Sequence, residues 1–329
     1  MQDKLTPRQV RAWSLCALSV PAAMALPGCG WLWVLGGSIL ACALAACQQA
    51  MQRHSGLCMR QAFARAFGAV GGRIMAAAEL LWLLFAASGA AAASQIAFEA
   101  DLGPFLPAIP LLLAALAGQK GRLAAGRVCA VLALCLAGLY AVIAAASLRH
   151  VQADWSRPQG VPADAALAFC LCLGPVCMAF VTAEEETPRI SPGTAAASAL
   201  LPAVPAFLTA ACLSPELARQ EPLPFLTLTK SLSVLSVMQR FELLLSVAQL
   251  LGLFALLTML VCAAERMLGA VRRKNGMGST GGVFCLLAFD GSFLAYRLPI
   301  WSWAVGAAIF WGVVPILTQV IVNIKKSEK

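Results

Sequence analysis

Long runs of apolar residues alternate with short polar segments along nearly all of the 329-residue chain. Most runs approach the roughly 17–25 residues that an α-helix needs to cross the hydrocarbon core of a bilayer. The pattern predicts about ten membrane-spanning helices, of which the fourth and the ninth are short. Their expected ranges are 10–27, 31–50, 73–98, 104–118, 124–147, 164–183, 195–213, 242–264, 281–296 and 299–323.

The composition agrees with this pattern. Hydrophobic residues make up 60% of the chain and charged residues 12%, whereas soluble domains have about half and about a quarter. No polar block is long enough to fold alone, so residues 1–329 are expected to form a single membrane domain. The expected fold class is an all-α integral membrane protein.

Basic residues are distributed unevenly between the predicted loops. If the N-terminus is cytoplasmic, 18 of the 24 Lys and Arg residues fall on the cytoplasmic side. This bias favours an even number of spans with both termini in the cytoplasm. The net charge of +9 then reflects topology and contact with anionic lipid. A nucleic-acid partner is not expected, because no folded module presents a basic face.

Prolines occur at similar depths of the first and sixth predicted spans. Pro21 follows the start of the first span by eleven residues, and Gly174 and Pro175 occupy the corresponding part of the sixth. Interrupted helices at matching positions are typical of transporters built from inverted repeats. We therefore predict a 5+5 inverted repeat, residues 10–147 and 164–324, with helices 1 and 6 interrupted. The alternative is a proline kink in each continuous helix.

Interrupted helices expose backbone N–H and C=O groups that can hold the carboxylate and the amine of an amino acid. Small residues near the two prolines would leave room for such a molecule. The residues small enough to admit it are Ser14, Ser19, Ala22, Ala23, Gly174 and Thr182.

Two ionisable residues interrupt predicted spans, Glu79 in the third and Asp290 in the ninth. A charge within a bilayer is costly, so such residues usually face a cavity or a partner. Either is a candidate for proton coupling or substrate binding. Alternatively, Glu79 lies at the cytoplasmic interface beside Arg73, and Asp290 caps a short or re-entrant segment.

The sequence offers little material for catalysis. His54 and His150 are the only histidines, and no nucleophile, metal-protease or phosphate-loop motif occurs. The thirteen cysteines lie mostly within apolar runs, where they are expected to pack as small side chains. We expect no enzymatic activity, no cofactor, no metal site and no disulfide framework.

The segment PFLTLTKSLSVLSVMQRFELLL, residues 224–245, places charges directly before a long span. Leu226, Leu232, Leu235 and Met238 share a helical stripe, which predicts an amphipathic helix on the outer membrane face. Arg240 and Glu242 would lie at the interface where the eighth span begins. Residues 51–72 are a second candidate for an amphipathic helix, on the cytoplasmic side.

The same segment carries a family resemblance. A proline-led amphipathic stretch followed by an Arg–apolar–acid triplet resembles the spore germination permease family, the B subunits of germinant receptors. The opening KLTPRQVRAWSLCALSVPAAMALPG, the AFVTAEEETPR of span six and the tail WGVVPILTQVIVNIKKSEK are also similar to that family. The chain departs from the family pattern in carrying three acids, Glu184 to Glu186, where one is usual.

The resemblance implies a ten-helix fold of the amino acid–polyamine–organocation superfamily and a role in germination. A germinant such as an amino acid would bind within the bundle, and the subunit would signal with a membrane A subunit and a lipoprotein C subunit in the inner spore membrane. The alternatives are a proton- or sodium-coupled transporter of amino acids or amines, and a scaffold that binds nothing. The residues and the resemblance together predict three sets of functional positions. The ligand-binding positions are Ser19, Val20, Pro21, Ala22, Ala23, Gly174, Pro175, Phe180 and Thr182. The coupling or polar intramembrane positions are Glu79, Glu184 and Asp290, and the interfacial or assembly positions are Arg240 and Glu242.

Overall fold

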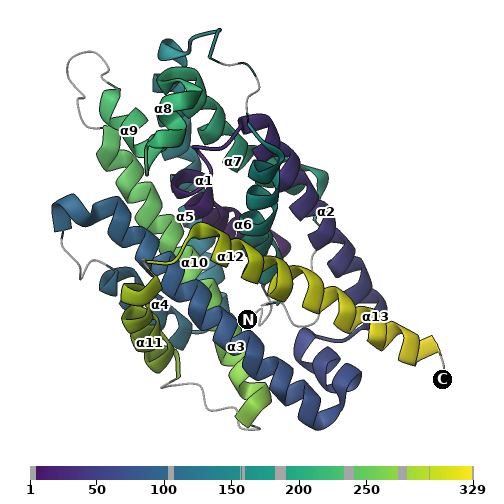
Figure 1. Cartoon of the computed structure of the whole chain (residues 1–329). Helices are drawn as coiled ribbons and strands as arrows, with labels where there is room; N and C mark the ends of the chain where they lie inside the picture. The colour runs from purple at the N-terminus through teal and green to yellow at the C-terminus, as the bar shows by residue number, and fades with distance from the viewer. Residues whose placement is uncertain are drawn as a thin grey trace.

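The structure is a computed structural model of the chain, and nearly all of what it describes is helical (Figure 1). No strand occurs in the part of the chain that it covers. The described residues are 5–102, 107–155, 157, 160–181, 190–232, 241–272, 280–295 and 297–327, with the side chains of 95–102, 177–181, 241, 270–272 and 280 left out.

Every predicted span coincides with a helix, and the last is formed by three consecutive segments. Six helices are long and apolar enough to cross a membrane, and α4, α6 and α11 are shorter apolar helices. The described part of the chain is therefore all-helical, and its long helices have the length and composition of those in integral membrane proteins. The helices are α1 (Pro7–Met24), α2 (Trp31–Ser55), α3 (Met59–Leu102), α4 (Ala108–Gln119), α5 (Arg122–Ser147), η1 (Leu148–His150), α6 (Pro162–Val181), α7 (Pro192–Leu213), α8 (Pro215–Gln220), α9 (Pro224–Ser231), α10 (Phe241–Arg272), α11 (Thr280–Ala295), α12 (Ile300–Ala307), η2 (Ala308–Val313) and α13 (Val314–Ser327).

Helix α1 begins at a capping box. The Thr6 hydroxyl accepts the backbone N–H of Gln9 at 3.4 Å, and the Gln9 side chain accepts the backbone N–H of Thr6 at 2.9 Å. Pro7 occupies the first helical position, where no N–H is needed. The Thr-Pro-Arg-Gln sequence therefore caps α1, because it supplies acceptors for two backbone N–H groups that the start of the helix would leave unpaired.

The predicted interruptions of helices 1 and 6 are wrong. Pro21 lies inside α1, which ends three residues later at Met24, and Pro175 lies inside α6, which continues to Val181. A proline removes the hydrogen bond to the carbonyl four residues before it, a loss that helices in membrane bundles tolerate. The Ser14 hydroxyl of α1 donates to the Pro175 carbonyl at 3.2 Å, which ties the two helices together at this point. The alternative of continuous helices that contain proline is the correct one.

Helices α1 and α10 lie at the centre of the bundle. Most side chains of α1 are buried, and the helix packs against α5, α6, α7 and α10. Helix α10 in turn contacts α3, α4, α5 and α11. The indole N–H of Trp13 donates to the Ala255 carbonyl at 2.9 Å, so the two central helices are joined by a buried hydrogen bond.

Three tryptophan rings lie against glycines of neighbouring helices. A Cβ atom added to Gly306 of α12 would meet the ring of Trp82 on α3, and one added to Gly89 of α3 would meet Trp303 on α12. The third ring, Trp311 of η2, lies against Gly174 of α6. Each glycine lets a large flat ring approach a helix backbone closely.

One end of the bundle is held by Asp164, at the start of α6. Its carboxylate accepts the backbone N–H groups of Gly30 at 2.8 Å and Val161 at 3.3 Å, and it lies 3.7 Å from the guanidinium of Arg219 on α8. Burial, and secondly the Asp164 charge, raise the pKa of the nearby Cys29 to about 12, so this thiol stays neutral. Asp164 connects the α1–α2 loop to α6.

The two predicted amphipathic segments are mostly helical where described, with residues 56–58 and Leu232 outside the helices. Residues 59–67 form a helix joined to the rest of α3 through Gly68, whose φ is +77°, and Ala62 and Ala66 are buried against Val322 of α13. In α9, Phe225 and Leu228 face the protein interior, whereas Leu226 is only partly buried. The prediction was therefore wrong in assigning Leu226 to the apolar face of this helix, because the face that packs on α7 and α10 contains Phe225 and Leu228 instead. Leu235, Met238 and Arg240 lie outside the described residues.

We predict that Gly306→Ala destabilises the fold. The added methyl group would collide with the Trp82 ring, and overpacking of this kind costs about 1–3 kcal/mol. The matched control is Gly138→Ala on α5, where nothing lies within 4 Å of the added atom. Thermal unfolding in detergent should show a lower midpoint for Gly306→Ala and an unchanged or higher one for Gly138→Ala. Equal midpoints would contradict the packing described.

We also predict different outcomes at the two members of the Asp164–Arg219 pair. Asp164→Ala leaves two backbone donors without their acceptor, at a cost of about 1–3 kcal/mol. Arg219→Ala should change stability by less than about 1 kcal/mol, because the Arg219 side chain is 46% exposed. Thermal unfolding measures both effects, and a larger loss for Arg219→Ala would refute this ranking.

Candidate functional site

An apolar cavity of about 240 Å³ lies between α1, α3, α6, α10 and α12. Helix α1 contributes Val20 and Pro21, and α6 contributes Leu171 and Pro175. Trp82, Trp303 and Trp311 form much of the remaining wall, together with alanines of α3. None of the described lining residues carries a charge, so the cavity suits a small molecule with a substantial apolar part.

The predicted ligand-binding residues separate into two groups. Val20, Pro21 and Pro175 line the cavity. Ser19, Ala22, Ala23 and Gly174 are buried but are not among its lining residues. The side chain of Phe180 and all of Thr182 lie outside the described residues.

Helical geometry explains this separation. Successive residues of an α-helix point about 100° apart, since one turn takes 3.6 residues, so five consecutive residues cannot face one cavity. Ser19 instead lies against Gly252 of α10 and donates to the Cys16 carbonyl at 2.6 Å. Ala23 belongs to a cluster with Ile143 and Leu208. Of residues 19–23, only Val20 and Pro21 line this cavity.

The tryptophans of the cavity were missed in the sequence analysis. Trp82 stacks on Phe310 with ring centroids 5.5 Å apart and meets Trp311 edge-on at 5.3 Å, while Phe85 stacks on Trp303 at 3.8 Å. Within the described part of the chain, the indole N–H groups of Trp82 and Trp311 have no acceptor. Trp82 lies within a membrane span, away from the interfaces where tryptophan is usually enriched. This position was the signal in the sequence that could have identified Trp82 as a candidate site residue.

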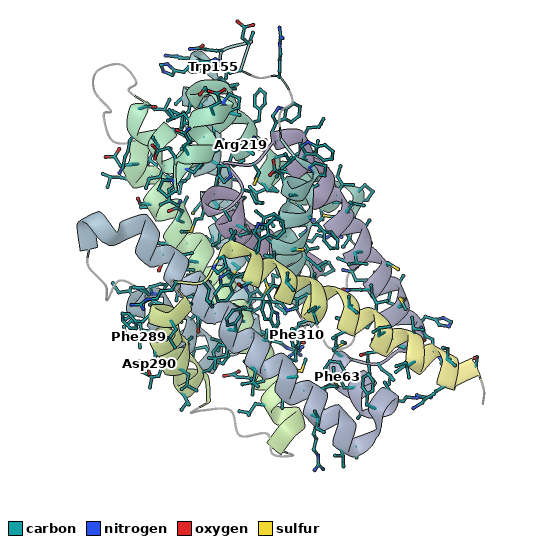
Figure 2. All side chains as sticks on the ribbon, viewed as in Figure 1. Phe63, Trp155, Arg219, Phe289, Asp290 and Phe310 are labelled. Carbon is teal, nitrogen blue, oxygen red and sulfur yellow. The ribbon has the colours of Figure 1, made fainter. Side chains whose placement is uncertain are left out.

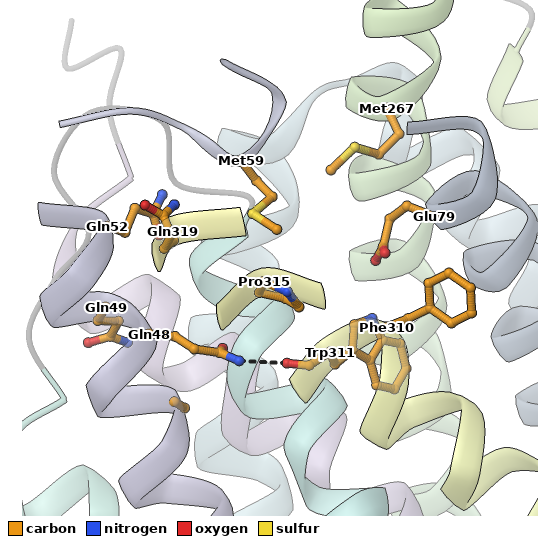
Figure 3. Close-up of a pocket in the computed structure, with 11 residues that line it drawn as sticks. Gln48, Gln49, Gln52, Met59, Glu79, Met267, Phe310, Trp311, Pro315 and Gln319 are labelled. Atoms are coloured by element: carbon orange, nitrogen blue, oxygen red, sulfur yellow. Dashed lines mark hydrogen bonds between the residues drawn. The ribbon is translucent and has the colours of Figure 1, made fainter. Parts of the chain in front are cut away.

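A second, polar cavity of about 40 Å³ lies beside the first, bordered by α2, α3, α10, η2 and α13. Figure 3 shows Glu79 with its carboxyl group pointing into this space. Glu79 is 7% exposed, and its Oε2 atom has no hydrogen-bond partner among the described residues. Gln49 and Gln319, each 2% exposed, also line the cavity. Glu79 therefore faces a cavity, as one of the two sequence interpretations expected.

The other candidate acidic residues lie elsewhere. Asp290 is exposed on the outer face of α11, next to Leu286 and Leu294 in the helical repeat (Figure 2). It lines neither cavity, so the structure does not bring it together with Glu79. Glu242 is partly exposed in the first turn of α10, where a negative charge is favourable. Glu184 and Arg240 lie outside the described residues.

The described residues contain no group of three or more His, Cys, Asp or Glu side chains placed to hold a metal ion. The cysteines that the structure describes are free thiols, and several are deeply buried. Their surroundings are those of packing residues.

No protein-family model matches the chain, and no curated protein matches it. The features that bear on function are therefore the two cavities and the arrangement of the helices around them.

Proposed function

We propose that this protein is a permease-like membrane protein that binds a small molecule in the apolar cavity. The observation that carries the proposal is the meeting of Pro21 and Pro175 at one cavity, although 154 positions separate them in the sequence. These prolines hold corresponding places in the first and sixth spans. Permeases with repeated halves bind their substrates at the interface between the repeats.

The cavity suggests the chemistry of the ligand. A volume of about 240 Å³ is smaller than the roughly 300–1,000 Å³ of sites for drug-sized ligands. Apolar walls suit the side chain of an apolar amino acid or the hydrocarbon part of an amine. The indole N–H of Trp82, which has no acceptor among the described residues, is one donor for a carboxylate of the ligand.

The packing of the helices supports two repeats of five helices. Exchanging the halves pairs α1 with α6, α2 with α7, α3 with α10, α4 with α11, and α5 with α12–α13. Under this exchange the α1–α7 contact corresponds to α6–α2, the α3–α11 contact to α10–α4, and the α5–α10 contact to α13–α3. All six contacts occur, as a pseudo-twofold axis between the halves would require. The α1–α10 contact at the centre of the bundle has no comparable α6–α3 counterpart among the described residues, so the agreement covers part of the packing.

Within this class we propose a germinant-sensing subunit, on the strength of the resemblance to the spore germination permease family. Ligand binding would favour one of two bundle conformations through its differential affinity, and partner subunits would read the change. The proposed partners are a membrane A subunit and a lipoprotein C subunit in the inner spore membrane. The proposed topology has both termini in the cytoplasm.

A second candidate function is proton- or sodium-coupled transport of amino acids or amines. The observation that favours it is Glu79, a buried carboxyl group beside the ligand cavity. Coupled transport needs an ionisable group whose charge state changes during the cycle, and intramembrane carboxylates commonly have this role.

Binding and uptake assays distinguish these functions. A panel of amino acids and amines is titrated into the purified protein in detergent, and every hit is tested for uptake into proteoliposomes with and without a proton or sodium gradient. We expect binding without uptake. Gradient-driven uptake would establish the transporter instead, and the absence of any binding would refute both functions and leave a scaffold.

We predict that Gly174→Leu abolishes binding of any hit from this panel. A side chain at this position must displace the ring of Trp311 from α6, and that ring is part of the cavity wall. The matched control is Gly138→Leu, whose added side chain has open space. Size-exclusion chromatography and thermal unfolding establish that both variants are folded. Unchanged affinity in a folded Gly174→Leu protein would exclude this wall from the site.

A further inference from the structure

The polar cavity contains a carboxyl group without a compensating charge. Glu79 is the only titratable residue among the residues that line it, and its Oε2 atom has no partner among the described residues. A buried carboxylate is costly unless a cation or several donors compensate it, and a proton removes the charge altogether. The surroundings of Glu79 therefore favour its protonated form.

Among the described residues, the charged groups on the neighbouring elements do not line the cavity, although Arg53 reaches one of its lining side chains. On α2, Arg53 donates to the side chain of Gln49 at 3.4 Å, and on α13, Lys325 donates to the Ala66 carbonyl at 2.7 Å. On α10, Glu265 faces the positions of Gly118 and Gly281 on α4 and α11. Lys326 donates to the His54 carbonyl, and Arg73 and Arg266 do not line the cavity.

The size and donor set of the cavity indicate a proton with water. About 40 Å³ exceeds the roughly 10–15 Å³ that a cavity needs to hold a water molecule, and is too small for an amino acid. The unpaired polar atoms are two acceptors, on Glu79 and Gln319, and two donors, on Gln49 and Trp311. Two donors facing the space disfavour a metal cation, which collects oxygen ligands.

Trp311 forms part of the wall of both cavities. It belongs to η2, a π-helical turn within the last span, and π-helical turns frequently mark functional sites. The side chain of Gln48 donates to the carbonyls of Trp311 at 2.7 Å and Gly312 at 3.3 Å (Figure 3), which steadies this turn. A movement of the indole ring would change the shape of both cavities together.

We propose that Glu79 is a proton-binding site, and that Trp311 couples its protonation to the occupancy of the apolar cavity. The reaction is the reversible transfer of one proton from water to a carboxylate oxygen. The ionised form attracts the unpaired donors of the cavity, and the neutral form releases them. The coupling rests on the proposed ligand cavity, whereas the proton site does not.

Infrared difference spectroscopy tests the proton site without any ligand. The purified full-length protein is moved from mildly alkaline to mildly acidic buffer, and the C=O stretch of protonated carboxyl groups is recorded. We expect a band in the wild type that Glu79→Gln removes and Glu265→Gln leaves unchanged. Glu79→Asp, which keeps a carboxyl group, should shift the band without abolishing it. An identical band in Glu79→Gln, or a band that disappears on adding sodium chloride at constant pH, would overturn the proposal.

Tryptophan fluorescence tests the coupling. The contribution of Trp311, obtained as the difference between wild type and Trp311→Phe, should change with pH in the wild type and not in Glu79→Gln. A pH-independent contribution, or an unchanged response in Glu79→Gln, would overturn the coupling. If the infrared band depends on Glu79 but no amino acid or amine binds, the proton site stands and the proposed ligand function fails.

Discussion

Close contact between tryptophan rings and glycine backbones is the constraint on which the interior of this protein depends. Helices in a membrane gain little from the hydrophobic effect, so they associate through tight packing, often at small residues. Trp82 and Trp303 lie on glycines of each other's helices, which fixes α3 against α12, and Trp311 on Gly174 fixes the last span against α6. The rings that close these interfaces also form the walls of the apolar cavity.

This arrangement links the two cavities. Rigid rings separate an apolar space from a small polar one, and Trp311 contacts both. A ligand that moved this ring would act on the surroundings of Glu79 without touching the carboxyl group. The same geometry therefore accommodates a sensor, in which the movement is passed to partner subunits, and a transporter, in which it is linked to a proton.

The helices were predictable because long apolar runs are a strong and local signal, and six of the described helices are long and apolar enough to cross a membrane. The start of α1 depends on an equally local signal, since Thr6 and Gln9 interact within one turn.

The site was only partly predictable. Pro21 and Pro175 were identified, but the sequence did not show that their helices continue or that Ser19 turns toward Cys16. Glu79 and Asp290 looked alike in the sequence, and the rotation of each helix decides that one is buried and the other exposed. Such rotations, like the pairing of each tryptophan with a glycine, arise from contacts between distant segments.

The central claim is that a small molecule binds between the two halves of the chain, against the tryptophan rings. The most direct measurement is the quenching of tryptophan emission by the tightest-binding amino acid or amine, compared between Trp303→Phe and Trp33→Phe. Trp303 lines the cavity, whereas Trp33 is 39% exposed on α2. The account predicts that Trp303→Phe removes much of the quenching and that Trp33→Phe leaves it intact. Full quenching in Trp303→Phe, with its loss in Trp33→Phe, would place the ligand outside the cavity and contradict the account.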